Sequence, residues 1–460
     1  MTGTQPHTSA DPAAPARGAG TPLALAALMA GTLVGTVSNN VVNVPLGAIL
    51  EEFDAPLGSG VFVVVGFLLT FTATMPLAGW IGDRFGRRRI YIVALVATAV
   101  CAIGAATAPS LQLLITWRCL GGVAAAAFAP AVMGLLTWMF SGDRRGRAVG
   151  VWASVNGVGQ AVGPTMGGFV ADAWGWRWVF IPLVPIALAG LIGTVRHIPA
   201  YPGTRMPFDL IGAGALTFGT GLLILGIALI PQPGTSVLVI AAIVAALVVL
   251  ALFVWRSLRV AHPFVDVRLV AEVRFARATL AAYAQMFCLG ATLLAVPLFL
   301  VGGGRSATVA GLTLLAVPAT MAVLGPLVGR YLDRLGPRRV MRTGLAVLLV
   351  TQIGLGVVLS DLTAGSWALP LLVGILFVTG VGIALVQTPA ATGATRSPAG
   401  AQGTGLGLYN LIRFGGSATG AAWVAVALDI ASYPVVFAAA AVVVALGLAG
   451  SFLGPDPAPV

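Results

Sequence analysis

The stretch Gly79-Trp-Ile-Gly-Asp83-Arg84-Phe-Gly86-Arg87-Arg88-Arg89 recurs further along the chain as Gly329-Arg-Tyr-Leu-Asp333-Arg334-Leu-Gly336-Pro-Arg338-Arg339. Each copy joins two long apolar segments. Solenoid repeats have periods of about 20 to 50 residues, far shorter than the 250 positions that separate these two copies. The repeat therefore indicates a chain that is built from two related halves.

The composition indicates a polytopic membrane protein. Hydrophobic residues make up 58% of the 460 residues and charged residues only 8%, which is too apolar for a single water-soluble core. A membrane span needs about 20 predominantly apolar residues. We therefore expect an all-α fold, and fourteen segments qualify as spans: 23–50, 59–80, 90–108, 111–139, 147–170, 178–195, 209–230, 236–255, 276–300, 308–330, 340–360, 367–389, 403–428 and 434–453.

Arginine is distributed unequally between the two sets of connections. The connections on the side of both termini carry 21 Arg, whereas the opposite connections carry only Arg177 and Arg305. Basic loops remain in the cytoplasm. We therefore expect a multi-pass protein of the cell (cytoplasmic) membrane with both termini in the cytoplasm. The net charge of +11 is then explained by the arginines that orient the protein in the membrane. Nucleic acid is therefore not an expected partner.

The two copies of the repeat follow the second and the tenth apolar segments, and this placement divides the chain. We expect five parts: a disordered cytoplasmic tail over 1–22, a six-helix bundle over 23–195, two inserted transmembrane helices with flanking cytoplasmic loops over 196–275, a second six-helix bundle over 276–453 and a cytoplasmic tail over 454–460.

Two further motifs lie in the first half. Leu114-Ile-Thr-Trp-Arg118-Cys-Leu-Gly-Gly122 places an arginine inside a span, where a cation is costly and usually lines a polar cavity. Gly159-Gln160-Ala-Val-Gly163-Pro164-Thr-Met-Gly167-Gly168 places glycine at every fourth position, on one helix face. We expect these glycines and the proline to form a close helix contact and a bend.

Together these motifs resemble the signature set of the major facilitator superfamily, and within it the fourteen-span drug/proton antiporters, over about residues 23–453. The resemblance implies the major facilitator fold, with two six-helix bundles and two extra central transmembrane helices. It also implies a secondary active transporter that exports a small hydrophobic or amphipathic compound, such as a drug or antibiotic, by alternating access in exchange for protons. The repeat resembles the gating motif of the family, which here comprises Gly79, Asp83, Arg84, Gly86, Arg87 and Arg88 in the first copy and Asp333, Arg334, Gly336 and Arg338 in the second.

Polar side chains inside the spans are candidates for the substrate or coupling cavity. They are Ser38, Asn39, Asn43, Arg118, Asn156, Gln160, Tyr283, Gln285, Gln387, Asn410 and Arg413. For any single Asn or Gln, a hydrogen bond between helices is the competing interpretation. We expect Arg118 to be stabilised by Asn39, Asn43 or Gln160, so that the cavity carries a fixed positive charge.

The spans contain no Asp, Glu or His near their centres, although relatives often carry an acid where this chain has Ser38, and tetracycline exporters carry Glu at Gln160. A proton-coupled carrier needs a titrating group, which Arg cannot supply. The titrating group is then an acid near the outer ends of the spans, at Glu51, Glu52, Asp361 or Asp429, or the substrate itself. The alternative function is a facilitator, or an exporter of an anionic metabolite, without proton coupling.

Other function classes find little support in the sequence. Paired carboxylates, metal-ligand clusters and a P-loop are missing from it, so we expect neither an enzyme nor a metal site nor a cofactor. A membrane receptor, the remote alternative, is expected to carry a sizeable domain outside the membrane. The expected partners are a small-molecule substrate, protons and the lipid bilayer, and the expected state is a monomer.

Overall fold

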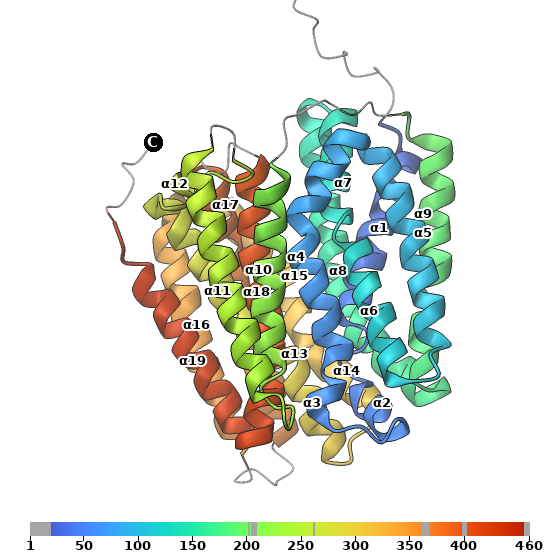
Figure 1. The fold of residues 1–460 in the computed structure, drawn as a ribbon, viewed down its shortest axis with the longest axis vertical. Helices are drawn as coiled ribbons and strands as arrows, with labels where there is room; N and C mark the ends of the chain where they lie inside the picture. The colour runs from blue at the N-terminus through green and yellow to red at the C-terminus, as the bar shows by residue number, and fades with distance from the viewer. Residues whose placement is uncertain are drawn as a thin grey trace, which may run out of the picture.

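The structure is a computed structural model, and it describes residues 20–200, 203, 209–260, 263–360, 368–397 and 403–454. The predicted tails at 1–22 and 454–460 fall almost wholly outside these residues, and so does Asp361. The described residues form helices and no strands, and the long helices run roughly side by side (Figure 1).

The first half is built around α1, which packs against α8 on one side and α9 on the other. Its elements are α1 (Pro22–Asn40), α2 (Leu46–Glu52), α3 (Leu57–Gly60), α4 (Phe62–Phe85), α5 (Arg87–Ala106), α6 (Leu111–Ala125), α7 (Phe128–Met139), α8 (Gly142–Trp174), the 3-10 helix η1 (Trp176–Phe180) and α9 (Leu183–His197). The predicted span 23–50 is broken before Leu46, where Pro45 lacks a backbone donor.

The second half is built around α13, which packs against α17, α18 and α19. Its elements are α13 (Val273–Gly302), α14 (Ala307–Leu314), α15 (Ala316–Leu335), α16 (Pro337–Val358), α17 (Ala368–Thr395), α18 (Gly403–Ile430) and α19 (Tyr433–Gly450). The short helix α12 (Val267–Val270) precedes it.

The two copies of the repeat adopt the same backbone turn. Gly86 ends α4 with φ 98° and ψ 120°, and Gly336 ends α15 with φ 82° and ψ 117°. A positive φ of this kind is open to glycine and strained for other residues. The matching glycines therefore allow one helix to stop and the next to start within one residue in both halves.

Thirteen of the described helices are long and apolar enough to cross a membrane, whereas the sequence predicts fourteen spans. The remaining predicted span, 147–170, lies within α8, which is 33 residues long and hence about 50 Å. Its glycines and its polar residues Asn156 and Gln160 lower its hydropathy. The helix nevertheless lies alongside the others because α1, α14 and α15 cover much of it.

The inserted pair α10 (Leu210–Ala228) and α11 (Ser236–Arg259) lies in front of the boundary between the halves in Figure 1. Helix α10 contacts α4 of the first half and α18 of the second. Asp209 caps α10 and pairs with Arg256 at the end of α11, with an Oδ1 to Nη2 distance of 2.8 Å. Burial opposes ionisation of Asp209, but hydrogen bonds from the Gly212 N–H and from Arg256 outweigh it and lower its pKa.

The halves also meet directly, along α8 with α14 and α15 and along α4 with α18. We call the end that holds Gly86 and Gly336 the Arg-rich end, and the end that holds Glu52 and η1 the opposite end. Helix α1 starts and α19 ends at the Arg-rich end (Figure 1).

Candidate functional site

Arg118 lies in the interior of the first half, on α6. Its guanidinium donates from Nε to the carbonyl oxygen of Val63 at 2.9 Å and from Nη1 to the carbonyl oxygen of Ser38 at 2.8 Å. It also lies over the ring of Phe67, 4.4 Å from the centroid. Only 3% of the residue is exposed. Carbonyl dipoles and an aromatic face therefore compensate the charge in place of a carboxylate.

These partners correct the expectation that Asn39, Asn43 or Gln160 stabilise Arg118. Ser38 does meet Arg118, but through its main-chain carbonyl, which every residue type carries. A cavity of about 10 Å³ borders both residues and has room for about one water molecule. The positive charge of Arg118 thus lies inside the first half and away from the polar pair on α8.

Asn39 on α1 and Asn43 in the turn that follows it each carry a buried side-chain oxygen that has no hydrogen-bond partner among the described residues. A buried acceptor without a partner is costly and is normally satisfied by water or by a ligand. On α8, Gln160 donates from Nε2 to Oδ1 of Asn156 at 3.1 Å, and both side chains are half-buried.

Three candidates of the second half take part in hydrogen bonds between helices. Gln285 on α13 donates to Oε1 of Gln387 on α17 at 3.4 Å, which joins two predicted cavity residues. The hydroxyl of Tyr283 lies 2.9 Å from that of Thr419 on α18. Gln285 is fully buried, whereas Tyr283 and Gln387 retain exposed surface. Hydrogen bonds of this kind between side chains of neighbouring helices also occur where they serve helix packing alone.

Arg413 on α18 has a buried Nε without a partner among the described residues, and Arg118 has a buried Nη2 without one. Its guanidinium lies 5.0 Å from the ring centroid of Phe414. Phe414 in turn meets Phe71 of the first half edge to face, with centroids 5.1 Å apart. Asn410, one turn before Arg413, is half-buried.

No hydrogen bond between described residues joins the candidates of the first half to those of the second. The structure therefore distributes the predicted cavity residues over separate places. Arg118 meets Ser38, Asn156 meets Gln160, Gln285 meets Gln387 and Tyr283 meets Thr419. Asn39 lies at the end of α1 and Asn43 just after it, and Asn410 and Arg413 lie on α18.

The glycines of α8 lie against α1. A Cβ atom at Gly163 would lie 2.9 Å from Cβ of Asn40, and one at Gly167 would lie 2.1 Å from the carbonyl oxygen of Val41. Gly159 faces Thr36 in the same way. Every fourth residue of α8 must therefore lack a side chain for the two helices to lie this close.

The adjacent face of α8 lies against α14 of the second half. A Cβ at Gly168 would lie 2.2 Å from the carbonyl oxygen of Ala307, and one at Gly311 would lie 2.7 Å from that of Pro164. The hydroxyl of Thr165 donates to the carbonyl of Gly311 at 3.3 Å. The motif around Pro164 thus packs against α1 of its own half and against α14 of the second half.

Asp172, at the end of α8, caps the first turn of α14 across the boundary between the halves. It accepts from the N–H of Ala307 at 3.1 Å and from the N–H and hydroxyl of Thr308 at 2.6 Å each. Burial opposes ionisation of Asp172, but the hydrogen bonds from Thr308 and Ala307 outweigh it and lower its pKa. The sequence alone does not single out Asp172, because nothing local marks its partner 135 residues away.

Glu52 lies at the same end and binds within the first half. It pairs with Arg177 and accepts from Nε1 of Trp176 at 2.6 Å. Glu52 is exposed, and the hydrogen bond from Arg177 outweighs its small loss of hydration and lowers its pKa. Glu51 and Asp429, the other described acids predicted for coupling, are exposed.

The first copy of the repeat forms a cluster within the first half at the Arg-rich end. Nε of Arg87 lies 2.6 Å from Oδ1 of Asp83, and the guanidinium of Arg87 occupies the space that a side chain at Gly134 would need. A Cβ atom at Gly79 would lie 3.6 Å from Cβ of Pro130. Arg84 lies over Trp80, 5.3 Å from the ring centroid.

Arg88 and its counterpart Arg338 bind helix ends. Nη2 of Arg88 donates to the carbonyl of Val195 near the end of α9 at 3.0 Å. Arg338 donates to carbonyls that follow the end of α19, those of Ser451 at 2.9 Å and Gly454 at 2.9 Å. Arg334 is exposed, and the side chain of Asp333 lies outside the described residues.

The comparisons with known proteins agree with this architecture. The Major Facilitator Superfamily matches residues 25–421, with a second match over 304–460. A multidrug resistance protein, Stp, of Mycobacterium tuberculosis is 31% identical over 402 residues, covering 85% of this chain and 74% of that protein. The methylenomycin A resistance protein of Bacillus subtilis is 29% identical and covers 79% of both chains.

A third relative is the tetracenomycin C resistance and export protein of Streptomyces glaucescens, which is 26% identical over 73% of this chain and 63% of that protein. Among solved structures, a peptide transporter POT in complex with sulfate superimposes with a TM-score of 0.69 over 94% of both chains, at 16% identity. The structural likeness, at this low identity, shows the fold alone. The family match covers residues 25–421, a range that includes the repeat, the Arg118 segment and the α8 glycines. This chain, which is not an enzyme, therefore belongs to the major facilitator superfamily.

Proposed function

We propose that this protein exports small hydrophobic or amphipathic compounds, similar to drugs or antibiotics, across the cytoplasmic membrane by alternating access. Its relatives support this proposal, since they include multidrug resistance, methylenomycin A resistance and tetracenomycin C resistance and export proteins. The 21 Arg on one side support a cytoplasmic position for the Arg-rich end and both termini. The moving parts are the bundles over 23–195 and 276–453, with 196–275 inserted between them.

The observation that carries the proposal is the contact between the halves at the opposite end. At the opposite end, Asp172 and Gly168 of α8 hold the start of α14. At the Arg-rich end, Arg87 and Arg88 make their contacts within the first half. A contact between the halves at one end is what a state of an alternating-access cycle that is closed at that end requires.

We propose that protons drive export through acids at the outer ends of the spans. Among the described residues no Asp, Glu or His lies near the centre of a span. Glu51, Glu52 and Asp429 lie at the opposite end, where the halves meet. Asp172 holds that contact as a carboxylate and is not part of this coupling set, because its hydrogen bonds lower its pKa.

The test is the accumulation of a compound panel in cells with and without the protein, each with and without a proton uncoupler. Export coupled to protons predicts lower accumulation in expressing cells and loss of the difference on uncoupling. A Gly167→Leu variant serves as the inactive control, because a side chain at Gly167 would overlap the backbone of α1. Equal accumulation in all cells, for every compound, contradicts export.

A second candidate function is a facilitator or an exporter of anionic metabolites without proton coupling. The buried, partnerless Nε of Arg413 favours it, because a carboxylate or phosphate would satisfy that donor. This function predicts transport of anions that an uncoupler does not change and that Arg413→Gln removes. Transport of cationic dyes that survives Arg413→Gln argues against it.

A further inference from the structure

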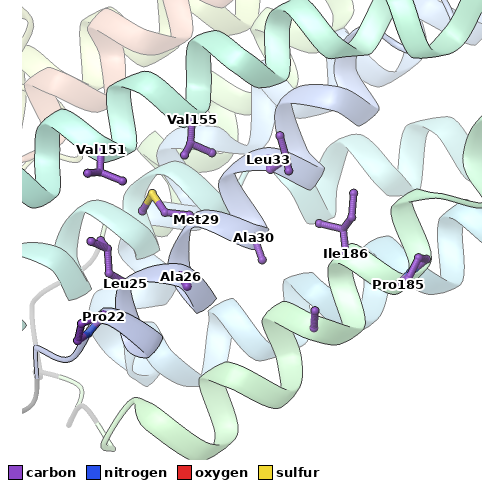
Figure 2. A pocket seen from close by; sticks show the side chains of 11 residues that line it. Pro22, Leu25, Ala26, Met29, Ala30, Leu33, Val151, Val155, Pro185 and Ile186 are labelled. Carbon is purple, nitrogen blue, oxygen red and sulfur yellow. The ribbon is translucent and has the colours of Figure 1, made fainter.

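An apolar groove of about 690 Å³ runs along α1 between α8 and α9. Figure 2 shows its lining side chains converging from the three helices. Helix α1 forms the floor, because Gly159 of α8 and Gly190 of α9 hold those helices close to it on either side. The lining residues are all apolar and include Leu25, Ala26, Val151, Val155, Ile186 and Ala189.

The groove extends over half of a membrane. It follows α1 from Pro22, its first residue, to Leu33, a rise of about 17 Å. The hydrocarbon core of a bilayer is about 30 Å thick, so the groove matches the depth of one leaflet. A ligand that fills it from the Arg-rich end is therefore a single extended apolar chain.

The mouth of the groove at the Arg-rich end is basic. Arg147 and Arg144 lie one and two turns before Val151 on α8, and Arg196 lies in the last turn of α9. All three side chains are exposed, and Asp143 is the single acid beside them in the sequence. Basic groups at this depth attract anionic lipid headgroups.

We propose that the groove holds one acyl chain of an anionic phospholipid whose phosphate contacts Arg147 and Arg196. The apolar lining and the length of one leaflet select an acyl chain, and the arginines select a negative headgroup. A neutral phospholipid would fill the groove without using the arginines. A transported compound in the same place is the rival occupant. The inference does not depend on the direction or coupling of transport.

The experiment uses the purified full chain in detergent, stripped of lipid and then titrated with phosphatidylglycerol or phosphatidylcholine. Native mass spectrometry counts the bound lipids. Two arginines near the surface predict a preference of about 25-fold for phosphatidylglycerol. Arg147→Gln combined with Arg196→Gln should remove this preference. The matched control, Arg274→Gln combined with Arg339→Gln, removes two basic residues from the Arg-rich end of the second half and should keep it.

A second pair of variants tests the groove itself. Ala26→Trp fills it and should weaken phosphatidylglycerol binding at least tenfold, whereas Val244→Trp on the exposed face of α11 should not. Equal binding of the two lipids by the wild type, or full binding by Ala26→Trp, overturns the proposal. Displacement of phosphatidylglycerol by an exported compound also overturns it and assigns the groove to that compound.

Discussion

Arg88 and Arg338 occupy matching positions in the two copies of the repeat, and each donates to main-chain carbonyls at the end of the last helix of its own half. Arg88 binds the carbonyl of Val195, and Arg338 binds those of Ser451 and Gly454. The C-terminal end of a helix carries a partial negative charge and carbonyls without intrahelical partners. The arginine at the second position after the repeat's glycine therefore stabilises the last helix in both halves.

Arg338→Ala should lower the stability of the protein by about 1 to 2 kcal/mol, and Arg88→Ala by less. Arg338 makes several charge-assisted hydrogen bonds to carbonyls, whereas Arg88 makes one at an exposed position. Thermal unfolding of the purified variants shows which of the two substitutions lowers the stability more. Arg339→Ala is the control, because that side chain is exposed. An equal loss for Arg339→Ala and Arg338→Ala would contradict a specific role of the helix end.

The repeat shows how far sequence reasoning reaches. Two glycines at matching positions predict two matching turns, and Gly86 and Gly336 have closely similar backbone angles. The sequence does not show that the arginines that follow have different roles. Arg87 and Arg88 are adjacent in the chain, and only their partners in the structure distinguish them. Arg87 reaches Asp83 on the preceding helix, whereas Arg88 reaches the end of α9.

Gly167→Leu should abolish transport, and even Gly167→Ala should impair it. A Cβ at Gly167 would lie 2.1 Å from the carbonyl oxygen of Val41, so the backbone of α1 or α8 has to shift. Gly150→Ala is the matched control on the same helix, since no atom lies within 4 Å of its Cβ position. Transport assays with equal amounts of membrane-inserted protein compare the variants. Wild-type transport by Gly167→Leu would show that the α1 and α8 contact is not needed.

Arg118→Ala should lower the stability of the first half, and Arg118→Lys should lower it by a smaller amount. The guanidinium joins the carbonyls of Val63 on α4 and Ser38 on α1, and a hydrogen bond to a charged group contributes roughly 1.5 to 3 kcal/mol. Lysine keeps the charge but cannot reach two carbonyls with a planar fork. Unfolding midpoints measure stability, and transport per folded molecule separates stability from function. Unchanged stability of Arg118→Ala would contradict this role.

The partners of Arg118 mark the limit of prediction for the site. The residue type and its place within a span indicate a compensated cation, but its acceptors are main-chain carbonyls, which leave no trace in a sequence. The same limit applies to Asp172, whose partners are mostly backbone N–H groups of a helix in the other half. By contrast, the pairing of Gln285 with Gln387 joins two side chains that the sequence already singled out.

Asp172→Asn should loosen the closure between the halves at the opposite end. The carboxylate accepts from two N–H groups and one hydroxyl of α14, and an amide has one acceptor oxygen in place of two. Spin labels at Ala173→Cys and Arg305→Cys, in a background without the three native cysteines, report the distance between the halves. We expect a longer and broader distance distribution for Asp172→Asn than for the wild type.

The pH dependence follows from the lowered pKa of Asp172. A carboxylate whose pKa is lower in the joined state than its usual value of 3.8 stabilises that state fully above that value and loses the contribution as pH falls through the lowered pKa. The wild-type distance should therefore stay constant from about pH 8 to pH 5 and lengthen only below about pH 4. Asp429→Asn, which removes an exposed acid at the same end, is the control and should behave as the wild type. A distance that Asp172→Asn leaves unchanged would assign the closure to the packing of α8 on α14 alone. A wild-type distance that already lengthens between pH 8 and pH 5 would assign it to a different titrating group.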